Sequence, residues 1–153
     1  MTYKMLNKYF LSLLAVLLLS SHAYAAQKEP PIPDTFAEHK MVLQISDPNP
    51  FKQTLVLNVA GNLIKYYGLG NVDLEIVAFG PGLRLLMKGN PHQTRIQTLM
   101  DAGVRFSACE NTLVNFTKKL GYRPELMKGV MTVPAGAARI LQLNAAGYQL
   151  LKP

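Results

Sequence analysis

The chain has 153 residues, of which 49% are hydrophobic and 16% are charged, so it is long and apolar enough for one folded domain. This composition excludes a chain that is disordered throughout. The formal net charge is +7, but the positive residues are spread along the sequence and only Lys118 and Lys119 are adjacent. A nucleic-acid partner is therefore not expected, because a binding stripe needs clustered basic residues.

The first 25 residues have the pattern of a secretory signal peptide. Lys4 and Lys8 form a positive start, residues 11–19 form a short apolar run, and Ala23-Tyr24-Ala25 is a small-x-small cleavage site. The run is too short for a membrane span, although an uncleaved anchor is the alternative. We expect cleavage after Ala25 and a periplasmic protein that is not attached to the membrane.

The next segment, residues 26–39, is predicted to be an extended lead-in to a domain over residues 40–153. Pro30, Pro31 and Pro33 restrict the backbone and remove hydrogen-bond donors. Such a segment is expected to be mobile rather than part of the folded core.

Strands and helices are predicted to alternate along the domain. Short apolar runs bounded by turn residues predict strands over 40–45, 72–79, 104–108, 130–133 and 148–151. Helical spacing of apolar residues predicts helices over 51–67, 83–87, 91–102, 112–120 and about 136–146. This order predicts an α/β fold, a three-layer sandwich in which helices cover both faces of a mostly parallel five-stranded sheet.

Four loops leave the carboxyl ends of predicted strands, and in a parallel sheet they gather at one edge, where ligands bind. Glycine, proline and polar residues in such loops are also what turns require. Asp47 has a second expected role as the cap of the following helix. The candidate pocket residues are Ser46, Asp47 and Asn49; Gly80, Pro81 and Gly82; Glu110, Asn111 and Thr112; and Pro134, Ala135 and Gly136.

Cys109 is the only cysteine, and it stands between a predicted strand and a helix predicted to be capped by Asn111 or Thr112. Helix N–H groups and the positive end of the helix dipole favour the nucleophilic thiolate. Glu110 opposes this effect, and Arg105 is too far back along the strand to be expected at the sulfur. A single cysteine excludes an internal disulfide, so Cys109 is exposed and reactive, joined to another chain, or a small buried hydrophobic residue.

Other reactive arrangements are not indicated. His22 lies in the signal peptide, His39 precedes the first strand, and His92 belongs to a helix start near the opposite sheet edge. None is placed as a base for a cysteine hydrolase. The spacing of ligands does not predict a metal site, and residues 80–82 match neither a phosphate loop nor a dinucleotide fingerprint. No metal or other cofactor is therefore expected.

Four stretches resemble the DsrE/DsrF-like family, in the family's order: Lys40–Asp47, Val77–Leu83, Gly103–Leu113 and Val133–Gly136. The resemblance runs from about residue 40 to the end. It implies an α/β sandwich around a parallel five-stranded sheet and assembly into trimers or hexamers. Some family members relay sulfur through a cysteine that accepts and passes on a persulfide sulfur. By resemblance, Cys109 is the candidate carrier, and a sulfur donor or acceptor protein is a candidate partner.

Two functional hypotheses remain open. The first is a periplasmic protein that binds or relays sulfur as a persulfide or mixed disulfide on Cys109, as a carrier more than as a turnover enzyme. The second is a non-catalytic small-ligand-binding or assembly subunit in which Cys109 is structural. Predicted export excludes sulfur delivery to cytoplasmic tRNA modification.

Overall fold

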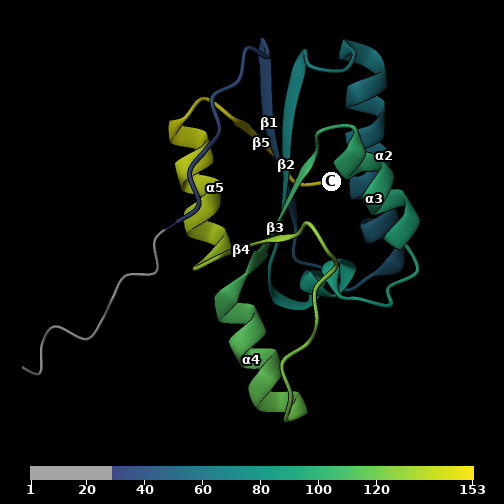
Figure 1. The fold of residues 1–153 in the computed structure, drawn as a ribbon, viewed down its shortest axis with the longest axis vertical. Coiled ribbons are helices and arrows are strands. Elements are labelled where there is room, and N and C mark those ends of the chain that lie inside the picture. The colour runs from purple at the N-terminus through teal and green to yellow at the C-terminus, as the bar shows by residue number, and fades with distance from the viewer. Residues whose placement is uncertain (1–28) are drawn as a thin grey trace, which may run out of the picture.

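The computed structural model describes residues 29–153, so the predicted signal peptide and its cleavage site lie outside the described residues (Figure 1). Five strands form one sheet in the order β4-β3-β2-β1-β5, and each strand pairs in parallel with the strand beside it. The predicted α/β sandwich is confirmed, and all five strands of its sheet are parallel. The strands are β1 (His39–Ile45), β2 (Val72–Ala78), β3 (Arg105–Cys109), β4 (Met131–Val133) and β5 (Gln149–Leu151).

Helical elements cover both faces of the sheet, which makes three layers. In Figure 1, α2 and α3 lie on one side of the sheet and α5 lies on the other. The helix α4 follows β3 and extends beyond the edge of the sheet. The bounds are α2 (Pro50–Tyr67), the 3-10 helix η2 (Gly80–Leu86), α3 (Gln93–Asp101), α4 (Glu110–Leu120) and α5 (Gly136–Ala145).

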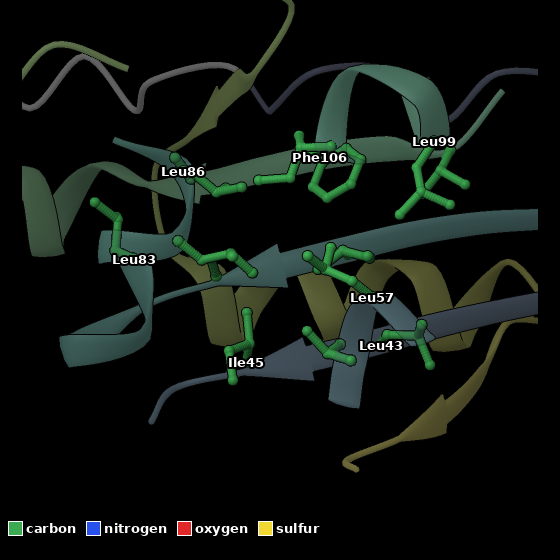
Figure 2. Packing of buried hydrophobic residues seen from close by; sticks show 14 of the residues in the cluster. Leu43, Ile45, Leu57, Leu83, Leu86, Leu99 and Phe106 are labelled. Atoms are coloured by element: carbon green, nitrogen blue, oxygen red, sulfur yellow. The ribbon is translucent and has the colours of Figure 1, made fainter. Parts of the chain in front are cut away.

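The main core lies between the sheet and the layer made by α2, η2 and α3. Figure 2 shows how side chains from these elements interlock over the sheet. Each buried leucine or phenylalanine contributes about 1.5–3 kcal/mol relative to an exposed one. The labelled members of this core are Leu43, Ile45, Leu57, Leu83, Leu86, Leu99 and Phe106, all of them buried.

The starts of two helices differ from the prediction. Cys109 is itself the N-cap residue of α4, in an extended conformation, so the helix begins at Glu110 and not after Asn111 or Thr112. In α3, the side chain of Asn90 accepts a hydrogen bond from the His92 N–H (2.7 Å) and holds a turn there. Helix α3 therefore begins at Gln93, two residues after the predicted start.

The helical spacing of Leu113, Phe116 and Leu120 predicts that all three face inward, and the burial of α4 differs from this prediction. Leu113 is fully buried, Phe116 is half-buried, and Leu120 is 50% exposed. The reason is the direction of the helix, which leaves the carboxyl edge of the sheet instead of lying along a face. Only the first turns of α4 reach the core.

The proline-containing lead-in is extended over its described part, and it packs on the α5 side of the sheet. Ile32 packs against a second cluster formed by Val42, Val77, Ile140, Leu143 and Tyr148. Ala37 is buried, and its N–H donates to the Thr35 hydroxyl (3.1 Å). In Figure 1 this dark-blue segment runs alongside α5. The described part of the lead-in therefore contacts the domain.

Candidate functional site

The four predicted loops meet at the carboxyl edge of the sheet and are joined by hydrogen bonds. These bonds connect residues that are distant in the sequence, so the edge is one connected structure. The links are the Gly82 N–H to the Ser46 carbonyl (3.1 Å), the Gly80 N–H to the Thr112 hydroxyl (2.9 Å) and the Asn111 N–H to the Pro134 carbonyl (3.3 Å).

Cys109 lies where the N-termini of two helices come together. It ends β3 and caps α4, and its side chain makes no capping hydrogen bond. Gly136, the first residue of α5, is so close that a Cβ atom there would lie 3.3 Å from the Cβ of Cys109 and 3.0 Å from the Phe79 ring. The glycine therefore lets the start of α5 approach the cysteine. The positive ends of both helix dipoles favour a negative charge nearby.

The thiol is buried in this arrangement. Cys109 is 5% exposed and belongs to the main core cluster. A small hollow of about 150 Å³ lies beside Ser46 and Asp47. Larger hollows of about 540 and 480 Å³ are lined by residues of α3 and of the segment 125–131, and Cys109 is not among their lining residues.

The charge of Glu110, expected to oppose a thiolate at Cys109, is paired with Arg123. The two guanidinium Nη atoms donate to the two carboxylate oxygens at 2.7 and 2.6 Å. These hydrogen bonds hold the pKa of Glu110 below its usual value. The chain after α4 folds back along the helix to make this contact, and the negative charge of Glu110 is thereby balanced by the positive charge of Arg123.

Asp47 and Asn49 both serve the start of α2. Asn49 is the N-cap, and its side chain accepts from the Phe51 N–H at 2.8 Å. Asp47 accepts from the Asn49 N–H at 2.9 Å and pairs with Lys52 at 3.1 Å. The hydrogen bond from Asn49, followed by that from Lys52, lowers the pKa of Asp47. The capping role considered for Asp47 thus belongs to its neighbour Asn49.

A buried ion pair on the α5 side of the sheet was missed by the sequence reasoning. Glu75 of β2 and Arg139 of α5 are both fully buried. Arg139 donates from Nε and Nη2 to the two carboxylate oxygens of Glu75 at 2.8 and 3.0 Å. The Ser107 hydroxyl adds a third bond at 2.7 Å, and the Arg105 Nε adds a fourth at 3.2 Å. Every oxygen of this buried carboxylate therefore has a partner.

The same network continues to the start of β2. Arg105 pairs with Asp73 (2.5 Å) and donates to the Tyr148 hydroxyl (3.0 Å), which in turn donates to Asp73 (2.8 Å). Burial, followed by the hydrogen bond to Asp73, raises the pKa of Tyr148 to about 12. Arg105 thus faces the carboxylates of β2, in agreement with the expectation that it does not serve Cys109.

A sequence signal for this network existed. Asp73 and Glu75 alternate with apolar residues in β2, so they lie on the same side of the strand as Val77. Arg105 and Ser107 have the same spacing in β3, the neighbouring strand. Two carboxylates inside a buried parallel strand require partners, because unpaired buried charges are strongly unfavourable.

Over residues 29–153, no helix is long and apolar enough to cross a membrane. In that same part of the chain, no group of three or more His, Cys, Asp or Glu side chains is arranged to hold a metal ion.

Solved structures with the same fold exist in archaea and bacteria. The protein of unknown function MTH1491 from Methanobacterium thermoautotrophicum is 26% identical, with a TM-score of 0.67 over 76% of this chain and 100% of that one. The ychN protein from E. coli is 17% identical, with a TM-score of 0.59 over 75% of this chain and 99% of that one. BT1422 from Bacteroides thetaiotaomicron, also of unknown function, is 15% identical, with a TM-score of 0.50 over 74% and 94%.

These similarities define the class of protein as an α/β sandwich whose fold is consistent with the DsrE/DsrF-like family. No protein-family profile matches the chain. No curated protein matches it significantly. The solved structures therefore support the fold of the chain.

Proposed function

We propose that this chain is an exported, periplasmic DsrE/DsrF-like protein that carries sulfur on Cys109. The observation that carries the proposal is the position of this single cysteine between the N-termini of α4 and α5. A persulfide is anionic, and helix N–H groups stabilise an anion at this place. The pairing with Arg123 offsets the negative charge of Glu110, the residue that follows Cys109 in the sequence.

The proposed reaction is the transfer of one sulfane sulfur. The thiolate of Cys109 attacks the terminal sulfur of a polysulfide or of thiosulfate, and an S–S bond forms at Sγ. The bond between that sulfur and the rest of the donor breaks, and the electron pair leaves with the shortened polysulfide or with sulfite. The product is a Cys109 persulfide. An acceptor thiolate can then attack its outer sulfur, and the Cys109 thiolate is released. The donor or acceptor protein is part of the proposal.

Intact-mass spectrometry after exposure to polysulfide or thiosulfate tests the proposal. We expect the wild-type protein to gain the mass of one sulfur atom and Cys109→Ser to gain none, because the thiolate is the sulfur nucleophile. A reductant should reverse the gain. The proposal is wrong if the wild type gains no sulfur or if Cys109→Ser gains the same mass.

A second candidate function, an assembly or small-ligand-binding subunit, is favoured by the surface of α4 and the segment after it. Val114, Leu120 and Tyr122 are 39%, 50% and 64% exposed on the part of the chain that projects from the sheet. Exposed apolar residues on a projecting element are typical of subunit contacts. In this account Cys109 is a buried structural residue, and the assembly is a homotrimer or homohexamer.

Sedimentation velocity tests the assembly role. We expect the wild type to sediment as a trimer or hexamer and Leu120→Lys to dissociate, because a charge would be placed in an apolar contact. Leu141→Lys is the matched control, since Leu141 is 70% exposed on α5. A monomeric wild type, or dissociation by Leu141→Lys alone, would rule out assembly through α4.

A further inference from the structure

Helix α2 carries an apolar stripe on the side that faces away from the sheet. Phe51, Leu55 and Tyr66 are 85%, 44% and 81% exposed. Together with the exposed Asn62, these positions fall within about 60° of arc on a helix of about 3.6 residues per turn, so they form one line along its surface. The stripe takes no part in the core, because the buried residues of α2 are others, namely Gln53, Val56, Leu57 and Ala60.

Few charges border this stripe. Lys52 and Lys65 are the only charged residues of α2, and Lys52 is paired with Asp47 at 3.1 Å. Asn58 and Asn62, which lie between the apolar side chains, are neutral. A strongly charged partner would find little to pair with on this face. A second copy of the same face, in contrast, would bring few like charges together.

The stripe is also self-complementary when two α2 helices run antiparallel. It has one aromatic side chain near each end, Phe51 and Tyr66. Around a two-fold axis at the middle of the stripe, Phe51 of each copy would lie opposite Tyr66 of the other, and Leu55 would lie opposite Asn62. Such a contact uses the same patch on both copies and closes as a pair. The opposite ends of the two helix dipoles are then side by side, which is favourable.

The exposed area is large enough for such a contact. An aromatic side chain buries about 150–250 Å², so the two aromatic residues of each copy supply about 600–1,000 Å² between them. A specific interface needs about 1,000 Å² in total, counted over both partners. Leu55 and the neutral residues of the stripe add to the aromatic contribution. An apolar patch of this size is unusual on a protein that stays a monomer.

We propose that two copies of this chain associate through the exposed sides of their α2 helices, packed antiparallel about a two-fold axis. The pairing rests neither on the sulfur chemistry nor on a contact through α4. If copies also associate through α4, the α2 contact joins two such assemblies and doubles their size.

Sedimentation velocity of Tyr66→Lys tests the pairing. We expect the mass of the particle to fall to half that of the wild type, because each copy would place a charge in the apolar contact. Tyr66 is 81% exposed, so the fold itself should tolerate lysine there. Leu141→Lys is the matched control, since Leu141 is 70% exposed on α5, on the other side of the sheet. Its mass should equal that of the wild type.

A pair of introduced cysteines tests the antiparallel arrangement. In the double variant Leu55→Cys, Asn62→Cys the two positions are about 10.5 Å apart along one helix, too far for a disulfide within a chain. Oxidation by diamide should therefore link position 55 of one copy to position 62 of the other. Peptide mapping identifies the linked positions, and Cys109 stays in place because it is 5% exposed.

Several results would overturn the pairing: a monomeric wild type, an unchanged mass for Tyr66→Lys, or an equal fall in mass for Leu141→Lys. A link from 55 to 55 as the main product, or no link between copies, would overturn the antiparallel arrangement. None of these measurements depends on sulfur uptake by Cys109, so the failure of one proposal leaves the other to its own test.

Discussion

Replacing Arg139 by methionine should destabilise the domain by about 3–5 kcal/mol, because it leaves Glu75 unpaired in the interior. Both side chains are fully buried, and two hydrogen bonds of 2.8 and 3.0 Å join them. Methionine fills a similar volume, so the loss comes mainly from the stranded carboxylate. The midpoint of urea unfolding, measured with an unchanged slope, gives the difference in free energy.

Two variants control this result. Arg123→Met removes a half-exposed ion pair with Glu110 and should cost at most about 1 kcal/mol. Adding Glu75→Leu to Arg139→Met should recover a large part of the loss, because a buried ion pair can often be replaced by apolar residues. If both Arg139→Met and Arg123→Met lowered the free energy of unfolding by the same amount, the buried Glu75–Arg139 pair would matter no more to stability than an exposed ion pair.

The same ion pair makes the stability of the wild-type protein depend on pH in the acid range. Burial tends to raise the pKa of Glu75, but the hydrogen bonds from Arg139 and Ser107 outweigh it and hold the pKa below 4.5. The carboxylate therefore stabilises the fold above about pH 4.5. This contribution is lost as the pH falls further through the folded-state pKa, since the group must then take up a proton.

Gly82→Ala should cost about 1–3 kcal/mol or more, because a methyl group at this position meets backbone that cannot move aside. Its Cβ would lie 2.6 Å from the Ile45 carbonyl oxygen and 2.8 Å from the carbonyl carbon of Ser46. Gly82 does not have a positive φ angle, so the effect is steric. Thermal unfolding of the variant checks the loss.

Gly61→Ala is the matched control for Gly82→Ala. Gly61 lies inside α2, where a Cβ atom would meet nothing within 4 Å. Alanine is the better helix residue, so this variant should gain about 0.5–1 kcal/mol. If Gly82→Ala were as stable as the wild type, the close contact between η2 and the end of β1 would not be a constraint.

The order of the elements could be predicted because buried parallel strands leave a simple pattern. Apolar runs such as residues 40–45, separated by helices with clear glycine and proline ends, predict the sheet without knowledge of any contact. The meeting of the loops around Cys109 follows from the same topology. These conclusions depend on local sequence and on the general rule for parallel sheets.

The remaining features depend on contacts between distant residues. Arg139 reaches Glu75 across 64 positions of the sequence, and Arg123 reaches Glu110 across 13. Periodicity along one element carries no information about such partners. For the same reason, the apolar pattern of α4 predicted an inward face for Leu120, although the helix leaves the sheet.

The burial of Cys109 is also set by distant residues. Gly136 of α5, which follows much later in the sequence, packs beside it. The position of a cysteine between a strand end and a helix start does not by itself show whether its thiol is reactive or inert.

A crystal structure of the protein after exposure to polysulfide tests the central claim most directly. The account predicts one additional sulfur atom bonded to Sγ of Cys109, between the N-termini of α4 and α5. An unmodified Cys109, in crystals grown from protein held with excess polysulfide, would contradict the claim that this residue carries sulfur.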